Sequence, residues 1–539
     1  MNFNKRIKYL FLALFMIGSI GVSAQVSIGK DSVARGVLDV NNPQGLSNTW
    51  GIVLPKVESV SDVVSGYEND TVIPGTLVYD MTTHGVRMKT AKHGWTGPLL
   101  DEAGFNRTVE KLVGVGGNFQ VKFAAIGPQH TLCIGQDDRA VYAAGINSNS
   151  RTGIGRRASN MSTFTLIFAR RVVDVAAGSS HSAAVDTLGQ LWTWGLDDSY
   201  RTGLPDRGTG VNLGNSGNTS TPTLVTTYNA TESYIDTIFG RKVANAEGKA
   251  SRFGFAVQVE ISTTNTYVLT DDGKVYSVGG AMGTTTAGTG RGTAASATWA
   301  EIPFSLEAGD SIVQISASGT TAGAVSKRGR LYTWGVGSGY AVGANGTATS
   351  TTSKSTPALV TMPASDSVYM VAMGTRASAA ISYDRKRLYV WGAANKHGGL
   401  TTNNQNPIIA NNFPYLGPTD SIIYVAAQRY GVATADGGLQ VITTTGVYGT
   451  GLNTSGQVGN NTVTNLNSTW APINMTGIPR GTVFTTVARG TATTILTTGA
   501  NINADNTSMN NVAYGMGAVG ARQLGAILTA PRIPQQLTK

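Results

Sequence analysis

Short apolar segments that end in glycine recur along most of the chain. Each has the order apolar, aromatic, any residue, apolar or aromatic, glycine, with two looser copies near the C-terminus. The seven copies end at Gly145, Gly195, Gly279, Gly335, Gly392, Gly451 and Gly517. Successive glycines are 50, 84, 56, 57, 59 and 66 residues apart, so the second interval contains an insertion. The chain therefore repeats a unit of 50 to 60 residues seven times.

Each unit also contains two earlier apolar segments, separated by polar turns. Residues 172–178 and 182–185 are examples, and residues 271–274 form a typical Asp-Gly turn. These runs are short and rich in Val, Ile, Tyr, Trp and Thr, so each unit reads as strand, turn, strand, turn, strand. Sheets of three or four strands must stack to bury both faces, and radial closure leaves only short edges. The pattern predicts an all-β seven-bladed β-propeller; a β-sandwich array or a parallel solenoid is the alternative.

Two units resemble a known family. Residues 172–195 (VVDVAAGSSHSAAVDTLGQLWTWG) and 446–462 (GVYGTGLNTSGQVGNNT) are similar to the regulator-of-chromosome-condensation repeat family, whose repeats form seven-bladed propellers. The resemblance covers about residues 119–533 and is strongest in the second, fourth, fifth and sixth units. It implies a structural role for His130 and His181. The best-known relatives stimulate nucleotide exchange on a small GTPase and bind chromatin, an activity that fold alone does not transfer.

The N-terminus has the three parts of a secretory signal. Lys5, Arg6 and Lys8 precede the apolar run 9–17, and small residues lead to a cleavage site after Ala24. An uncleaved anchor is the alternative, but the run is shorter than the roughly 20 residues of a membrane span. We expect an exported protein at the outer membrane surface, in the periplasm or outside the cell, with no transmembrane span after cleavage.

The segment after the signal does not repeat the blade pattern. Residues 26–29, 36–40, 51–57 and 74–80, closing at 94–95, resemble an N-terminal module of secreted and surface proteins of the Bacteroidetes. Their alternation of Val, Leu and Tyr, with Pro and Gly between, indicates short β-strands. We therefore expect a signal peptide at 1–24, a small β-rich module at 25–105 and the propeller at 106–539.

Composition and charge limit the classes of binding partner and of metal site that the chain can have. The formal charge is +10, or +7 after removal of the three basic residues of the signal. Lys and Arg are scattered, so they indicate solvated surface and no nucleic-acid partner. The single cysteine, Cys133, lies in an apolar stretch and can form neither an intrachain disulfide nor a cysteine zinc site. It is expected to be a buried thiol.

Motifs for catalysis are absent from the sequence. It contains no HExxH, Walker, GxSxG or EF-hand pattern, and its five histidines are spread over different units. We predict no catalytic residue, no metal site and no cofactor. The insertion at about 196–249 is the best candidate for a binding loop, because loops on rigid scaffolds often carry recognition, although an ornament without function is the alternative. Its first residues supply the candidate binding set Asp197, Asp198, Tyr200 and Arg201.

Seven tripeptides of Asp, Ser or Thr, and an aliphatic residue match the O-glycosylation pattern of Bacteroidetes periplasmic proteins. Their acceptors are Ser32, Thr71, Thr187, Thr237, Ser311, Ser367 and Ser421. Asp-Ser before a strand is also good turn chemistry, so a repeated turn explains the same pattern. Both explanations stay open at the level of the sequence.

The sequence favours a secreted or cell-surface propeller that is a non-catalytic binding or scaffold module for protein or glycan partners at the envelope, for example in adhesion. One alternative is a polysaccharide lyase or hydrolase, which requires acidic groups or histidine to converge at the central channel. Convergence of two carboxylates, or of a histidine with an acid, within hydrogen-bond reach at one mouth of the channel would exclude a pure scaffold, and a channel lined by Gly, Ala and Ser would exclude the enzyme. The other alternative is a structural subunit of an envelope assembly.

Overall fold

The computed structural model describes most of the repeat region and short strands before it. The described ranges are 119–155, 160–204, 218–229, 234–240, 253–280, 288–292, 294–343, 351–399, 401–414, 416–431, 436–501, 509–510, 512–525 and 532–537, with seven N-terminal strands. Contacts divide the chain into residues 1–117 and 118–539. Each unit is described by itself.

The N-terminal unit contains only short strands among its described residues. The antiparallel pair β1 (Gln25–Ser27) and β2 (Val37–Asp39) is separate from a five-stranded sheet. The sheet consists of β3 (Lys56–Val57), β4 (Leu77–Asp80), β5 (Gly85–Thr90), β6 (Gly94–Trp95) and β7 (Leu100–Asp101). The signal peptide and the rest of the module lie outside the described residues, so both stay predictions.

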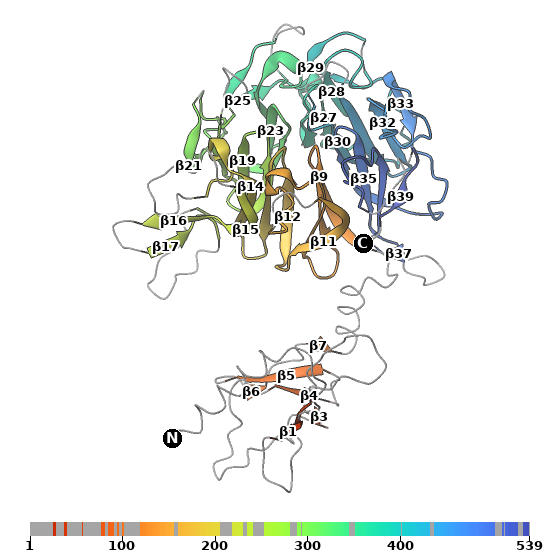
Figure 1. Cartoon of the computed structure of the whole chain (residues 1–539). Coiled ribbons are helices and arrows are strands. Elements are labelled where there is room, and N and C mark those ends of the chain that lie inside the picture. Colours follow the sequence, from red (N-terminus) through yellow and green to blue (C-terminus); the bar gives the residue numbers. More distant parts are fainter. Residues whose placement is uncertain are drawn as a thin grey trace. The chain divides into compact units, whose positions relative to one another are not determined.

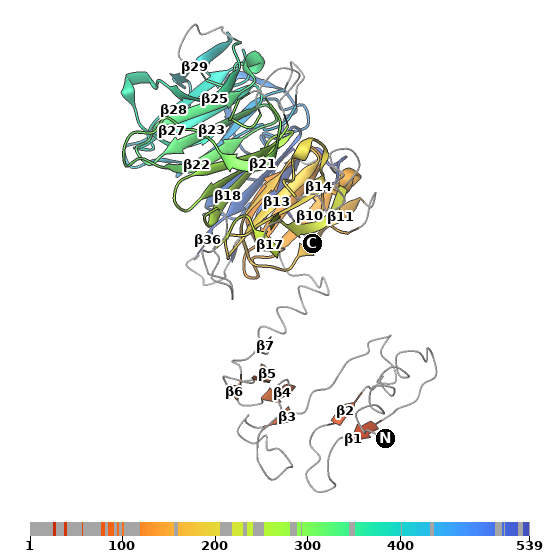
Figure 2. The same cartoon turned by 90° about the vertical axis from the view of Figure 1, so that its left-hand side faces the viewer.

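The second unit is an all-β propeller of seven four-stranded antiparallel blades (Figure 1, Figure 2). Its blades are, in order, β8 (Val121–Ile126), β9 (His130–Gly135), β10 (Val141–Gly145), β11 (Met161–Phe168); β12 (Val172–Ala177), β13 (His181–Asp186), β14 (Leu191–Leu196), β15 (Asn218–Leu224); β18 (Ala256–Ile261), β19 (Asn265–Thr270), β20 (Val275–Gly279), β21 (Ser296–Glu301); β22 (Ile312–Ala317), β23 (Thr321–Ser326), β24 (Leu331–Gly335), β25 (Lys354–Val360); β26 (Val368–Ala372), β27 (Ala377–Ser382), β28 (Leu388–Gly392), β29 (Asn404–Ile409); β30 (Ile422–Ala427), β31 (Gly438–Thr443), β32 (Val447–Gly451), β33 (Leu466–Pro472); and β34 (Phe484–Arg489), β35 (Thr493–Thr498), β38 (Ala513–Gly517), β39 (Gln535–Gln536). The predicted fold class is confirmed.

Burial falls from the second strand of each blade to the outermost. Every residue of the second strand is buried in all seven blades, because neighbouring blades cover both faces of the sheet. Outermost strands are more exposed, as in β21, where only Trp299 is buried. The apolar second strands and polar fourth strands of the sequence follow from this difference.

The repeated glycine closes the third strand for a steric reason. Gly195 has φ +103°, and a Cβ there would lie 2.6 Å from the Cα of His181. All seven glycines share a positive φ and an equally close approach to the backbone where the second strand begins. Only glycine tolerates both conditions, which explains why the repeat is visible in the sequence.

Buried tryptophans join neighbouring blades. Trp194 Nε1 donates to the carbonyl of Arg151 (2.9 Å), and Trp391 Nε1 donates to that of Ala341 (2.8 Å). The last blade closes on the first through an apolar cluster and through Gln523 Nε2, which donates to the carbonyl of Gly127 (2.6 Å). The ring is therefore closed by side-chain packing between its first and last blades.

Two elements account for the described part of the insertion. The fourth strand of the second blade, β15, lies within it, followed by the hairpin of β16 (Thr226–Asn229) and β17 (Tyr234–Thr237). A second small hairpin, β36 (Ala500–Asn501) with β37 (Met509–Asn510), extends the seventh blade. Among the described residues, no helix is long and apolar enough to cross a membrane.

Candidate functional site

The innermost strands of the seven blades surround a central channel with a volume of about 830 Å³. The first strand of every blade contains a β-bulge. The bulged residue is the second one of that strand, and it has no pairing partner on the neighbouring strand. In six blades the third residue then lines the channel. These six residues are Phe123, Asp174, Gln258, Gln314, Met370 and Tyr424.

One side of the channel is polar because its third residues also bridge blades. The side-chain amide of Gln258 pairs with the backbone N–H and C=O of Ile315 (2.9 and 2.8 Å), and Gln314 pairs in the same way with Val371. Asp174 accepts a hydrogen bond from the N–H of Val259 (2.8 Å). These bonds connect four consecutive blades, the second to the fifth.

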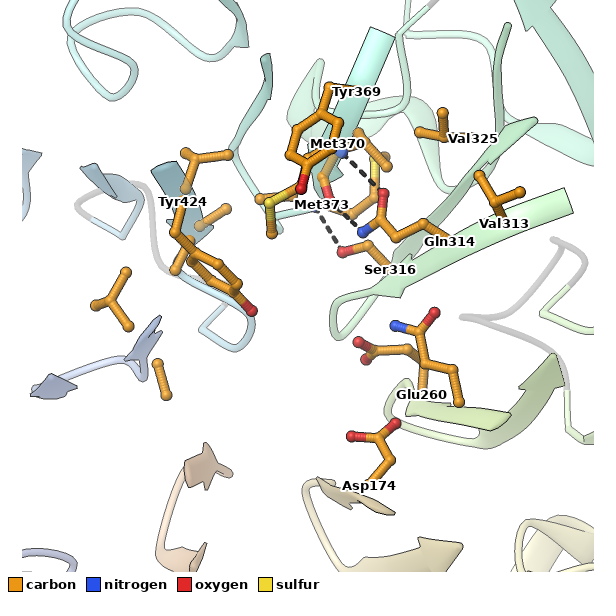
Figure 3. A pocket seen from close by; sticks show the side chains of 18 of the residues that line it. Asp174, Glu260, Val313, Gln314, Ser316, Val325, Tyr369, Met370, Met373 and Tyr424 are labelled. Carbon is orange, nitrogen blue, oxygen red and sulfur yellow. Dashed lines mark hydrogen bonds between the residues drawn. The ribbon is translucent and has the colours of Figure 1, made fainter. Parts of the chain in front are cut away.

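The opposite side is apolar and aromatic. Phe123, Met370 and Tyr424 come from the first, fifth and sixth blades. Figure 3 shows the hydroxyl of Tyr424 directed into the channel, toward the side that carries Asp174 and Glu260. Burial, and then the charge of Asp174, raise the pKa of Tyr424 to about 12. The channel therefore has one polar and one apolar wall.

Three charged groups meet inside the channel. The guanidinium of Arg429 forms an ion pair with Glu260, and its Nε donates to the carbonyl of Ala317 (2.8 Å). Asp174 is close enough to Arg429 for their charges to interact. Burial nevertheless raises the pKa of Asp174 to about 7, against the opposing effects of its bonds to the N–H groups of Val259 and Val175 and of Arg429. Glu260 is thus paired directly with Arg429, whereas Asp174 only lies within range of its charge.

The linker between the first and second strands of the sixth blade closes one end of the channel. This linker, residues 428–437, has ten residues, whereas the corresponding linkers of the other blades have three or four. The Tyr430 hydroxyl lies 3.0 and 3.1 Å from the carbonyl oxygens of Ala177 and Ile261, in the second and third blades. The seventh blade adds a bond from Thr491 Oγ1 to the carbonyl of Tyr430 (2.9 Å). We call this described segment, residues 428–431, the plug.

The other end of the channel opens through an apolar rim. The rim consists of four bulged residues of first strands and one turn residue, and all five line the channel mouth. With their exposed fractions they are Val173 (39%), Val257 (38%), Val313 (51%), Tyr369 (39%) and Tyr383 (65%). They come from the second to the fifth blades. The guanidinium carbon of Arg385 lies 4.1 Å from the centroid of the Tyr369 ring, so a cation stacks on this ring at the edge of the rim.

Comparisons with known proteins agree with this architecture. The family described as regulator of chromosome condensation (RCC1) repeat matches residues 172–201 and 328–381, which lie in the second, fourth and fifth blades. The structure is similar to that of Prp20p from Saccharomyces cerevisiae, with a TM-score of 0.53 and 16% identity over 78% of this chain and 88% of that chain. The chain carries RCC1 repeats.

Sequence relatives share parts of the propeller. The human E3 ubiquitin-protein ligase HERC2 is 28% identical over 249 residues, which are 44% of this chain and 4% of the ligase. The X-linked retinitis pigmentosa GTPase regulator of Canis lupus familiaris is 39% identical over 89 residues, 16% of this chain and 9% of that protein. The chain thus spans a small fraction of the length of these relatives.

The candidate binding residues of the insertion occupy a turn that the RCC1 repeats use elsewhere. Asp197 Oδ1 accepts from the N–H of Thr202 (3.0 Å), as Asn147 Oδ1 accepts from Thr152 in the first blade. Both turns are short 3₁₀ segments, Asp198–Tyr200 and Ser148–Ser150. The structure therefore brings the four residues together in one turn, where Asp197, Asp198 and Arg201 form hydrogen bonds or ion pairs within the fold.

Arg201 shows this engagement most clearly. Its guanidinium pairs with Asp198 and donates to the carbonyl of Thr263 in the third blade (2.9 Å). Burial lowers the pKa of Arg201 to about 10. Binding of a ligand by Asp197, Asp198, Tyr200 and Arg201 stays a prediction.

The histidines of the RCC1 repeats lie between blades, away from the channel. His130 Nε2 is 2.7 Å from Ser182 Oγ, and His181 Nε2 is 3.0 Å from Thr266 Oγ1. Burial, followed by the charge of a nearby arginine, lowers the pKa of both well below the ordinary value. Cys133 is buried, as predicted, and burial raises its pKa. In the described ranges, no group of three His, Cys, Asp or Glu residues is placed to hold a metal ion.

Four predicted glycosylation acceptors lie at the mouth side of the blades. Thr187 and Ser367 are exposed, while Ser311 and Ser421 are half-buried. Asp186 Oδ1 accepts from the N–H of Leu188 (2.9 Å), which is the turn bond that the alternative explanation requires. Ser32 and Thr71 lie outside the described residues, and Thr237 is described only as part of β17. Glycosylation stays a prediction.

The channel residues were not found from the sequence. Strand alternation does not show that Asp174 and Tyr424 share a cavity, because their blades are 250 residues apart in the chain. The plug left a clearer signal, since its linker is the longest of the seven. Comparing linker lengths between repeats would have identified Arg429 and Tyr430.

Proposed function

We propose that the chain is an exported, non-catalytic RCC1-repeat module that binds a protein partner across the open mouth of its channel. The observation that carries this proposal is the apolar rim. Five apolar or aromatic side chains stay exposed around one opening, and contiguous exposed apolar surface marks interaction sites. The sheets do not need these side chains, because four of them are bulged residues that do not pair with the second strand.

Protein binding fits what is known of the similar fold. The structure of Prp20p was solved together with a study of its binding to Gsp1p and histones. Those partners belong to that protein. For this chain, the predicted signal sequence at residues 1–24 supports a partner at the cell envelope.

The non-catalytic part of the proposal rests on how the channel carboxyl groups are used. Glu260 is paired with Arg429, and Asp174 accepts two backbone hydrogen bonds. The enzyme alternative gains one observation, since two carboxyl groups do face one channel and one of them has a raised pKa, as in a glycosidase acid and base pair. Release of reducing ends from envelope polysaccharide by the purified protein, abolished by Asp174→Asn, would favour the enzyme and contradict our proposal.

Charges placed on the rim test the proposal directly. We expect Val313→Glu with Tyr383→Glu to weaken capture of the partner from envelope fractions at least about tenfold, because two apolar contacts become buried charges. The matched control is Leu359→Glu, which changes a side chain with 42% exposure on the outermost strand β25. Capture is measured by quantitative mass spectrometry, after equal unfolding midpoints are established. Equal capture by the rim variant and the control would overturn the proposal.

A further inference from the structure

Asp174 is the channel carboxyl group for which the described residues offer no ion-pair partner. The charged residues that line the channel are Asp174, Glu260, Lys327, Arg429 and Arg489. The guanidinium of Arg429 is committed to Glu260 and to the carbonyl of Ala317, and that of Arg489 donates to Gln440 Oε1 and to the carbonyl of Leu452 (2.8 Å each). When Asp174 is ionised, no direct contact neutralises its charge, in a cavity where burial makes charge costly. A cationic ligand would offset that charge.

The two oxygens of Asp174 are partly occupied, which restricts the cation. Oδ1 accepts from the N–H of Val175 (3.0 Å) and Oδ2 from that of Val259 (2.8 Å). Each oxygen keeps one further acceptor position. A planar guanidinium favours two parallel bonds to a free carboxylate, whereas an ammonium group is a compact charge that needs only one acceptor in a given direction. The arrangement therefore suits an ammonium group better.

A second polar group points into the same space. Figure 3 shows the Tyr424 hydroxyl and the carboxyl groups of Asp174 and Glu260 directed into the channel from different blades. The Tyr424 side chain is half-buried, and its hydroxyl has no hydrogen-bond partner among the described residues. Its oxygen can accept a bond from an ammonium group, and its ring face attracts a cation.

The apolar wall suits a slender alkyl chain. Met370 and Phe123 line the channel beside Tyr424, and the rim valines lie above them. The cavity volume of about 830 Å³ falls in the range of small-molecule sites. Because the plug closes the inner end, a ligand enters from the mouth and stops at the charged cluster.

We propose that the channel binds an alkylammonium group, with Asp174 as its counter-ion, Tyr424 as a second contact and the apolar wall around its chain. The inference rests on the proposed function, because the channel opens at the face where we place the partner. A lysine side chain of that partner and a free amine share this chemistry. Lys327 lines the mouth and Arg385 lies at its edge, where solvent screens their charges from the inner end.

The test measures binding at the channel itself. The full chain is labelled with ¹³C-methyl methionine, so that the methyl signal of Met370, assigned with Met370→Leu, reports on the channel. Met161 on the outermost strand β11 is the control signal. The probes are Nα-acetyl-lysine methylamide and n-butylamine, with Nα-acetyl-norleucine methylamide and n-butanol as their uncharged counterparts. We expect both amines to shift the Met370 signal and to bind at least about tenfold more tightly than their counterparts at pH 8.

Two further measurements test whether Asp174 supplies the negative charge that binds the amine. Asp174→Asn is expected to weaken amine binding at least about tenfold. The control Glu301→Gln removes an exposed acid on β21 and leaves binding unchanged. Because the pKa of Asp174 is raised to about 7, its carboxyl group is mostly neutral at pH 6 and mostly ionised at pH 8. Amine affinity should therefore fall about tenfold from pH 8 to pH 6, while the ligand stays charged at both values.

Each outcome has a distinct meaning. Tighter binding of the lysine derivative assigns a peptide source, and tighter binding of butylamine assigns a free amine. Equal binding of charged and uncharged probes, or unchanged binding by Asp174→Asn, overturns the inference. If amines fail to bind but the rim variant still loses its partner, the proposed function stands alone. If amines bind and the rim variant captures its partner normally, the channel site is supported and the proposed binding of a partner at the rim is wrong.

Discussion

At the scale of single residues, the most visible positions of the repeat are structural. The seven glycines close third strands where no side chain fits, and His130 and His181 bond to the next blade from buried positions. The structural role that the family resemblance implied for both histidines agrees with these contacts. Repetition reveals such residues because every blade needs the same geometry, whereas a binding residue is needed in one blade only.

Asp174 provides a prediction at this scale. Its pKa is 3.8 without perturbation and about 7 in the folded protein, so the folded state holds the proton more tightly. Between about pH 4 and pH 7 this carboxyl group is neutral in the folded state and ionised in the unfolded state. Its contribution to stability is therefore largest in acid and is lost as the pH rises through about 7.

We expect Asp174→Asn to raise the melting temperature most at pH 8, where the wild type buries a charge, and to raise it less at pH 5. Differential scanning calorimetry at the two pH values measures this. Glu301→Gln, which changes an exposed acid, should show no such pH dependence. A uniform decrease of the melting temperature at both values would mean that Asp174 is stabilised by its bonds more than it is destabilised by its charge.

At the scale of elements, the sequence predicted the first three strands of most blades and missed the fourth. Strands such as β15 and β33 are polar and partly exposed, so they have no apolar pattern that separates them from loops. The sequence therefore did not separate the structural parts of the predicted binding loop at 196–249. Part of this segment is β15, and its opening residues form the repeated turn. The plug differs from these strands. The unusual length of its linker can be read from the sequence, but its contacts form only when the ring of blades closes.

The plug gives a prediction at this scale. Tyr430→Phe removes a hydroxyl that lies between the carbonyl oxygens of Ala177 and Ile261, which are left without that donor in a buried setting. We expect a loss of about 1–3 kcal/mol in the free energy of unfolding, measured by urea titration. Tyr383→Phe, at an exposed rim position, is the control and should be neutral. A neutral Tyr430→Phe would show that solvent already reaches these carbonyl groups.

At the scale of the whole molecule, counting the repeats was enough to predict the propeller. Seven units, each unable to bury its own faces, close into one ring. The channel chemistry could not be predicted in this way, because the lining side chains come together only when all seven blades are placed. Export, the N-terminal module and glycosylation concern the same scale and await measurement.

Intact mass spectrometry of the protein purified from envelope fractions tests export and glycosylation together. We expect a chain that begins at Gln25, because the small residues before it fit a signal peptidase site. Any additional mass should disappear when Ser311, Ser367 and Ser421 are changed to alanine together. A protein that starts at Met1 would contradict export through a cleaved signal. A mature protein without additional mass would leave turn chemistry as the explanation of the tripeptides.

The bulge repeated in all seven first strands has an evolutionary consequence. Each bulge releases one side chain from the sheet pairing, and in the second to fifth blades this side chain lies at the channel mouth. A mutation at one of these four codons changes the docking surface while the ladder and the core stay intact. A lineage can therefore exchange partners through single, separately tolerated substitutions, and sequence variation should concentrate there while the seven glycines stay constant.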